Sequence, residues 1–139
     1  MDTETGFVRL LRHFVVHDAG TVINPLLVDE QIRGGVVQGL GAALFEEITY
    51  AEEGNLLTGS LADYLVPMSA EMPDIIVAHA HGAAVHTELG AKGVGEAGVA
   101  GAPAAVLNAV NDALAPLGAR LSKLPMTPER ILFALGVVA

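Results

Sequence analysis

Residues 28–47 constrain the fold of this chain more than any other stretch, because they combine a helical apolar pattern with an excess of glycine. Large apolar residues recur at every fourth position, which predicts a stripe along one face of a helix: Ile32, Val36, Leu40 and Leu44. Glycine also occupies positions 34, 35, 39 and 41. Each of these glycines costs about 0.5–1 kcal/mol relative to alanine in a helix. The usual offset is the close approach of another backbone or of a ligand.

Gln38 lies inside this glycine-rich stretch and shares a helix face with Gly34 and Gly41. Its amide could exchange hydrogen bonds with a polar heterocycle, or it could stand at the edge of a tight contact between two helices. The spacing leaves both interpretations open, and tight packing is the commoner reason for glycines in a helix.

A second glycine-rich segment, residues 90–98, reads GAKGVGEAG and contains a literal G-x-G-x-x-G pattern. A dinucleotide-binding fingerprint should follow a hydrophobic strand and precede an acidic residue by about 20 positions. The preceding residues 86–89 make a poor strand, and Asp112 falls inside a predicted helix. The segment also lacks the Gly-Lys-Ser/Thr ending of a P-loop. We therefore exclude both kinds of nucleotide site.

The chemistry of the segment is nevertheless distinctive. Its glycines allow a backbone to approach a ligand closely, Lys92 adds a cation, and the segment leads into a helix N-terminus, which favours anions. Glu96 is the only carboxylate in an apolar stretch. It could cap the helix, or it could be a partly desolvated general base beside a bound group. The spacing does not decide between these two roles.

The remaining patterns predict an α/β (α+β) fold with a few strands and about three helices, at about residues 28–47, 97–114 and 128–135. Thr127 and Pro128 mark the start of the last helix as cap and first residue. Residues 82–95 are expected to be a functional loop. The strand candidates are residues 7–17, 48–50, 56–57, 75–79 and 121–124, with the second and third joined by a turn at 52–55.

Charge and composition exclude several classes of function. The net charge is -9, which repels phosphate backbones and argues against nucleic acid as a partner. The chain has no cysteine, so it offers no thiolate for zinc, iron-sulfur clusters or nucleophilic catalysis. No apolar run reaches the roughly 18 residues of a membrane helix. The polar start, MDTETG, does not resemble a signal peptide, so we expect a cytoplasmic location without membrane contact.

Histidine provides the other candidate metal ligands. His79 and His81 are two residues apart, so on a strand both would face the same side. With Glu88 or Glu96 they could in principle hold zinc, as in a stand-alone metal hydrolase, but no established ligand spacing supports this. Packed or solvated histidines are the simpler interpretation, and we predict no metal ligand on this chain.

Two long stretches resemble a known family. Residues 17–47, HDAGTVINPLLVDEQIRGGVVQGLGAALFEE, and residues 89–114, LGAKGVGEAGVAGAPAAVLNAVNDAL, are similar to the C-terminal part of the molybdopterin-binding large subunit of the xanthine dehydrogenase, aldehyde oxidase and carbon monoxide dehydrogenase family. The closing LPMTPERILFAL resembles the C-terminus of that subunit, and the opening DTETGFVRLLR an internal hairpin. The resemblance covers nearly the whole chain.

The resemblance implies specific roles for residues of the two motifs. By match to the GVGE motif, Glu96 is the base that takes a proton from molybdenum-bound water or hydroxide. By match to VQGLG, Gln38 with its neighbour Gly39 contacts the pterin. By match to AKGVG, the pterin is also bordered by Lys92, Gly93, Val94 and Gly95.

The resemblance also implies partners, because the family's subunit is several times longer than this chain. We expect residues 1–139 to form a single, incomplete domain at the C-terminal end of the second molybdopterin-binding domain. Another chain would carry the N-terminal part of the subunit. An iron-sulfur subunit, and in some members an FAD subunit, would receive electrons from the oxidation of an aldehyde, an N-heteroaromatic ring or a similar small substrate. The cytosine dinucleotide form of the pterin is usual in bacterial relatives. The alternative is a truncated remnant without catalysis.

Overall fold

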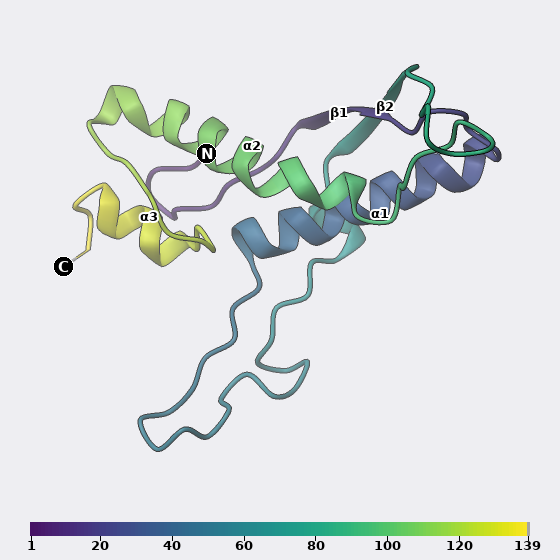
Figure 1. The fold of residues 1–139 in the computed structure, drawn as a ribbon. Helices are drawn as coiled ribbons and strands as arrows, with labels where there is room; N and C mark the ends of the chain where they lie inside the picture. Colours follow the sequence, from purple (N-terminus) through teal and green to yellow (C-terminus); the bar gives the residue numbers. More distant parts are fainter. Residues whose placement is uncertain (139) are drawn as a thin grey trace.

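The computed structural model describes residues 1–138, which form two strands, three α-helices and two short 3-10 helices (Figure 1). In chain order the elements are β1 (Arg12–Asp18), α1 (Pro25–Leu44), η1 (Ser69–Glu71), β2 (Asp74–Ala80), α2 (Ala97–Leu114), η2 (Ala115–Leu117) and α3 (Pro128–Ala134). This arrangement confirms the predicted α/β class and the three helices. The first helix begins and ends three residues earlier than the apolar pattern predicts.

The earlier start of α1 has a local cause. Asn24 caps the helix, since its side chain accepts a hydrogen bond from the Leu27 amide at 3.3 Å, and Pro25 occupies the first helical position. Both residues precede the range 28–47 that the apolar pattern predicts. At α3 the predicted cap is confirmed, because the Thr127 hydroxyl accepts from the Arg130 amide at 3.3 Å.

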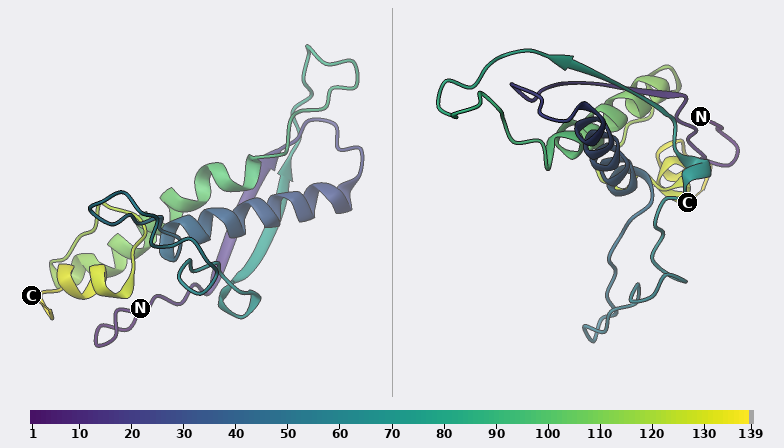
Figure 2. Two further views of the ribbon diagram at one scale, coloured as in Figure 1. Left: turned by 90° about the horizontal axis from the view of Figure 1, so that it is seen from below. Right: turned by 90° about the vertical axis from the view of Figure 1, so that its right-hand side faces the viewer.

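The two strands pair in parallel, with His17 opposite His79 and Val15 opposite Val77. The chain between them runs through α1, which packs on one face of the sheet together with α2 (Figure 2). Inward-facing Val15, Ile75 and Val77 pack against the helical core. The opposite face is open, and Phe14 and Val16 there are 66% and 70% exposed.

Helices α1 and α2 cross closely at three glycines. A Cβ at Gly98 would overlap the carbonyl oxygen of Ile32, and a Cβ at Gly35 would lie 3.0 Å from the Gly98 Cα. One turn further along, a Cβ at Gly39 would lie 2.7 Å from that of Ala102. Helix packing therefore explains two of the four glycines in α1. The core around the crossing is fully apolar, and its largest side chains are Ile32, Leu40, Leu114, Met126 and Ile131.

Residues 46–68, here called the arm, leave the end of α1 and project away from the helices in both figures. The predicted turn at 52–55 is present, but the predicted flanking strands reduce to a single antiparallel bridge between Tyr50 and Leu56. No second pair of strands covers the arm, so its short extended stretches have no neighbour with which to continue a sheet.

The prediction of an edge strand at residues 121–124 is wrong. The Asn111 side chain bonds both backbone groups of Leu121, donating to its carbonyl at 2.9 Å and accepting from its amide at 2.8 Å. A side-chain amide thus takes the place of a neighbouring strand, and the segment remains a loop.

Within residues 1–138, no helix is long and apolar enough to cross a membrane.

Candidate functional site

Residues 82–95, the loop predicted to be functional, contain neither helix nor strand and connect β2 to α2. Backbone hydrogen bonds attach it to the connection between β1 and α1. The Thr21 amide donates to the Gly90 carbonyl at 2.9 Å, and the Lys92 amide donates to the Ala19 carbonyl at 2.9 Å. An antiparallel bridge between Gly20 and Ala91 lies between these two bonds. The loop therefore has a defined path before it reaches α2.

Asp18, at the end of β1, is the centre of this attachment. Its Oδ2 accepts a hydrogen bond from Lys92 Nζ at 2.6 Å, and its Oδ1 accepts from the amides of Gly20 at 2.9 Å and Gly82 at 3.2 Å. We call these four residues the Asp18 junction. The Lys92 hydrogen bond, followed by that of the Gly20 amide, lowers the pKa of Asp18 from 3.8 to about 2. No local sequence pattern indicates that Asp18 pairs with Lys92, which lies 74 positions away.

Glu96 stands directly before the first residue of α2. It occupies the N-cap position, but its side chain makes no capping hydrogen bond. The first-turn amide of Ala97 instead donates to the Val94 carbonyl at 3.1 Å. The interpretation of Glu96 as a capping carboxylate is therefore wrong for the side chain, which is exposed to solvent at the positive end of a helix.

Gln31 of α1 holds the backbone just ahead of Glu96, since its side-chain nitrogen donates to the Gly95 carbonyl at 2.8 Å. The sequence analysis did not single this residue out. One signal was available: Gln31 precedes Gln38 by seven residues, so both lie on the same face of α1. Gln38 is exposed on that face, whereas Gly39 is buried in the helix crossing.

Gly93 and Gly95, which precede Glu96 closely in the chain, and Gly34 of α1 have no packing reason within the described residues. A Cβ at Gly34, Gly93 or Gly95 would meet no atom within 4 Å, and none of the three has a positive φ. Side chains would therefore fit at these positions in the chain alone. The backbone at Gly93 and Gly95 instead presents an open surface beside the carboxylate of Glu96, as expected where a planar ligand lies against the main chain. The residues present thus fit a large cofactor.

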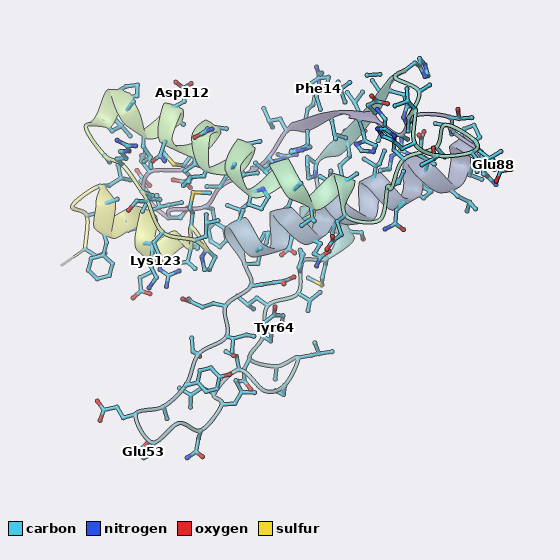
Figure 3. The ribbon with its side chains drawn as sticks, in the orientation of Figure 1. Phe14, Glu53, Tyr64, Glu88, Asp112 and Lys123 are labelled. Carbon is cyan, nitrogen blue, oxygen red and sulfur yellow. The ribbon has the colours of Figure 1, made fainter. Side chains whose placement is uncertain are left out.

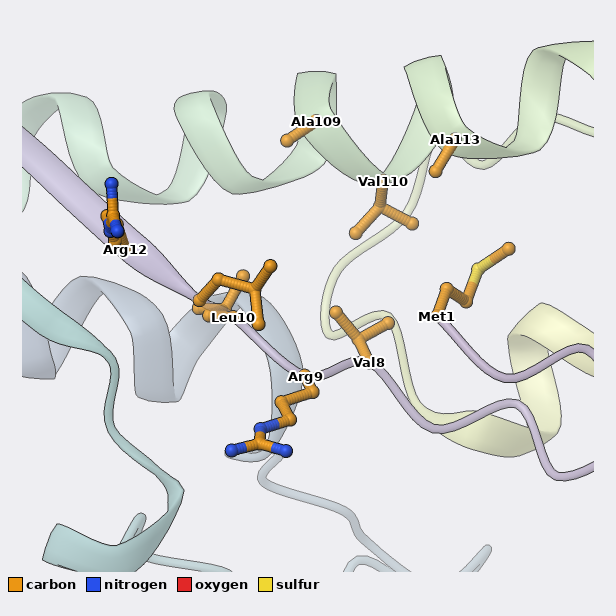
Figure 4. A pocket seen from close by; sticks show the side chains of 9 residues that line it. Met1, Val8, Arg9, Leu10, Arg12, Ala109, Val110 and Ala113 are labelled. Atoms are coloured by element: carbon orange, nitrogen blue, oxygen red, sulfur yellow. The ribbon is translucent and has the colours of Figure 1, made fainter.

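A pocket of about 500 Å³ adjoins this surface between the loop and the start of α1. Its polar lining comes from Thr21, Asn24, Gln31 and Lys92, and Val94 and Leu27 contribute apolar walls. A separate pocket of about 690 Å³ lies between the N-terminal segment and α2, as Figure 4 shows. Apolar side chains such as Val8, Leu10 and Val110 line it, and it contains no residue of the two motifs. Of these two pockets, the one of about 500 Å³ adjoins the residues of the second motif.

The histidines do not assemble a metal site. His79 Nε2 lies 2.7 Å from Asp29 Oδ1, so this imidazole ties the sheet to α1. His81 follows the end of β2 and is exposed. Within residues 1–138 no group of three or more His, Asp or Glu side chains is arranged to hold a metal ion.

Comparison with known proteins gives consistent relatives. A family model described as a molybdopterin cofactor-binding domain matches residues 1–73. The large subunit of nicotine 6-hydroxylase from Paenarthrobacter nicotinovorans is 49% identical over 134 residues, which are 96% of this chain and 16% of that protein. The carbon monoxide dehydrogenase large chain of Afipia carboxidovorans is 36% identical over 94% of this chain and 16% of its own length.

Solved structures show the same likeness in three dimensions. Quinoline 2-oxidoreductase from Pseudomonas putida 86 superposes with a TM-score of 0.95 at 43% identity, over 98% of this chain and 17% of the matched chain. The present chain thus spans about one sixth of the length of these relatives. From the family match, the sequence identities and the superposition, the chain belongs to the molybdopterin cofactor-binding domain family and is related to the large subunits of the xanthine dehydrogenase, aldehyde oxidase and carbon monoxide dehydrogenase group.

Proposed function

We propose that this chain forms part of a molybdenum hydroxylase and supplies its catalytic base and several of its pterin contacts. The observation that carries the proposal is the uncapped, exposed carboxylate of Glu96 beside the open backbone of Gly93 and Gly95. Glu96 is the base in this proposal. The proposed pterin site comprises Gln38, Gly39, Lys92, Gly93, Val94 and Gly95.

The two kinds of residue have different tasks. The molybdenum-molybdopterin cofactor, when bound, supplies the two-electron oxidation and the water-derived oxygen. Gly93 and Gly95 allow the pterin to lie against the main chain, and Gln38 offers a donor and an acceptor from α1. Glu96 accepts a proton at its carboxylate, which is exposed at the start of α2.

Lys92 and Gly39 play a more limited part in the proposal. The ammonium of Lys92 is paired with Asp18, so this residue borders the pterin through its backbone. Gly39 is buried against Ala102, so it supports Gln38 by allowing α1 to approach α2 closely.

The substrate that we favour is an N-heteroaromatic ring. Two of the relatives are called nicotine 6-hydroxylase and quinoline 2-oxidoreductase, and both names specify oxidation of such a ring. An aldehyde or a similar small molecule is the second candidate, because aldehyde oxidoreductases also share the fold.

The rest of the cofactor cage would come from residues outside these 139, since the relatives are about six times longer. We propose that a chain carrying the N-terminal part of the subunit completes the site. An iron-sulfur subunit, and in some assemblies an FAD subunit, would receive the electrons, because this chain has no cysteine to hold a cluster. The cofactor would be the cytosine dinucleotide form, and the location cytoplasmic.

The test is Glu96→Gln in the assembled enzyme. Loss of the base should abolish measurable turnover of an N-heteroaromatic substrate, while molybdenum content stays at the unmodified level. Glu88→Gln is the matched control, because Glu88 is an exposed glutamate of the same loop, at the end of the molecule where α1 begins (Figure 3). The control should keep full activity. Full activity in Glu96→Gln, at normal molybdenum content, would disprove the assignment.

The second candidate is a remnant without catalysis. It is favoured only by the small share of the relatives' length that the chain spans. Purification from the native host under mild conditions separates the two candidates. Stoichiometric molybdenum together with a larger partner chain supports the enzyme, whereas a chain that carries neither is a remnant.

A further inference from the structure

We propose that Asp18 is a positioning residue for this reaction: through Lys92 it holds the Gly93–Gly95 backbone, and with it Glu96, in place. The inference rests on the proposed function for the role of Glu96, although the junction itself is a feature of the fold. Asp18 lies 78 positions before Glu96 in the chain and touches neither it nor the open glycine surface. It would act entirely through other residues.

The contacts of Asp18 join its own turn to two points of a loop that lies 64 and 74 residues further along the chain. The carboxylate receives the Gly20 amide from its own turn, the Gly82 amide from the start of the loop, and the Lys92 ammonium from its far end. One carboxylate therefore closes the loop at both ends. Charge-assisted hydrogen bonds of this kind are about twice as strong as neutral ones.

Two glycines border the ion pair closely. A Cβ at Gly82 would lie 2.5 Å from Asp18 Oδ2 and 3.3 Å from Lys92 Nζ, so a side chain there would have to displace the ion pair. A Cβ at Gly20 would overlap the Gly90 carbonyl oxygen and lie 3.2 Å from the Lys92 side chain. The backbone is thus shaped around this one contact.

Lys92 is the link between the junction and the base. Its amide bonds Ala19 and its ammonium bonds Asp18, so both ends of the residue are attached to the β1–α1 connection. Gly93 follows directly, and Glu96 is four residues away. At Gly95 the Gln31 bond provides the next attachment. Without the Asp18 pair, the Gln31 bond to Gly95 would be the remaining side-chain hydrogen bond to the backbone of Gly93 and Gly95 in the described residues.

A different role for Lys92 makes the opposite prediction. If its ammonium served to bind an anionic group of the cofactor, Asp18 would compete for that charge. Asp18→Asn would then free the lysine and leave cofactor retention unchanged or improved, whereas Lys92→Met would reduce it. In the positioning role, both substitutions break the same contact and act in the same direction.

The experiment compares Asp18→Asn, Lys92→Met and the double variant in the assembled enzyme. Asparagine keeps an oxygen for the Gly20 and Gly82 amides, so Asp18→Asn removes the ion pair alone. Glu30→Gln is the control, because it breaks the exposed Glu30–Arg33 pair on α1, whose atoms lie 2.9 Å apart. The readouts are amide hydrogen exchange of residues 90–96, molybdenum content, and kcat and KM per bound molybdenum.

We expect each single variant and the double variant to raise exchange of residues 90–96 by about tenfold, since the loop then opens locally more often. We also expect kcat to fall roughly ten- to a hundredfold with little change in KM, because a misplaced base affects the chemical step. The double variant should be no worse than either single one. Lys92→Arg, which keeps a cation for Asp18, should recover most of the loss, and Glu30→Gln should change nothing.

Unchanged exchange in Asp18→Asn would overturn the proposal, as would opposite effects of Asp18→Asn and Lys92→Met on molybdenum content. Failure of the proposed function looks different. In that case Glu96→Gln would keep its activity, while the exchange data would still report whether Asp18 holds the loop.

Discussion

The Asp18 junction and the arm both belong to the non-helical part of the molecule, but different contacts hold them in place. The junction is closed by an ion pair and by backbone bonds that cross between distant segments. Within the described chain, no hydrogen bond joins residues 48–63 of the arm to anything outside the arm. At the base of the arm, Tyr64 donates to Glu46 at 2.8 Å and so joins the two ends of the arm, while Arg130 of α3 donates to Glu47 at 2.6 Å and ties the base to the helices.

The difference extends to the side chains. Apolar residues of the arm are largely exposed, with Leu61 at 83% and Ile48 at 61%. Exposed apolar side chains at this density are typical of surfaces that meet other protein. The loop at the junction is held by hydrogen bonds to the β1–α1 connection, whereas residues 48–63 of the arm form hydrogen bonds only within the arm. One loop of this chain is therefore held by contacts to distant segments, whereas the other is held mainly by contacts within itself.

The largest expected effect comes from a pair of glycine substitutions that compares the two regions directly. Gly20 has φ +62° and lies against Gly90, while Gly54, at the tip of the arm, has φ +86° and nothing within 4 Å. Alanine pays about 1–2 kcal/mol of backbone strain at either site. At Gly20 the collision adds about 1–3 kcal/mol. Chemical denaturation of the full chain should therefore show a clearly larger loss for Gly20→Ala. Equal losses would mean that the junction is no better determined than the arm.

How far the sequence predicts these regions depends on the range of the interactions. The helices follow from local spacing and from capping residues such as Thr127, and the loop from its glycines. The Asp18–Lys92 pair joins positions 74 residues apart, and no local pattern contains that information. The same is true of Gln31 and the Gly95 carbonyl. Family resemblance pointed to Glu96, but only the structure showed that its side chain does not cap the helix.

The features that the sequence analysis predicted wrongly or left open also depend on contacts between residues that are not neighbours in the sequence. Residues 121–124 have the apolar character of a strand, yet Asn111 satisfies the backbone groups that a strand would need to pair. In α1 the four glycines look alike in sequence, but Gly35 and Gly39 face α2 whereas Gly34 faces open space. Burial on a particular face depends on the partner helix, which local spacing does not specify.

A smaller effect is expected in the acid dependence of stability. The pKa of Asp18 is lowered in the folded chain from 3.8 to about 2, so its ionised form stabilises the fold. That contribution is fully present above pH 3.8 and is lost as the pH falls through about 2. The Asp18→Asn variant should therefore have a lower free energy of unfolding than the unmodified chain at neutral pH. This difference should shrink as the pH falls from 3.8 to about 2. Lys92→Met should show the same narrowing, measured by denaturation at a series of pH values. A constant difference would place the stabilisation elsewhere.

The smallest effect tests whether the base of the arm is closed in solution. The hydrogen bond to Glu46, with burial as a lesser cause, raises the pKa of Tyr64 above its ordinary 10.0. Because the protonated phenol is the favoured form, this bond supports the fold below pH 10.0 and is lost as the pH rises through the pKa of the folded chain. The chain has two tyrosines, so an ultraviolet titration of Tyr64→Phe reports Tyr50 alone, and subtraction gives Tyr64. Glu46→Gln should bring the pKa of Tyr64 back toward 10.0, with little change in the denaturation midpoint. An equal pKa of Tyr64 with and without the Glu46 carboxylate would mean that the Tyr64–Glu46 hydrogen bond does not form in solution. The arm would then be held by even fewer hydrogen bonds than the structure shows, and its difference from the junction would be larger.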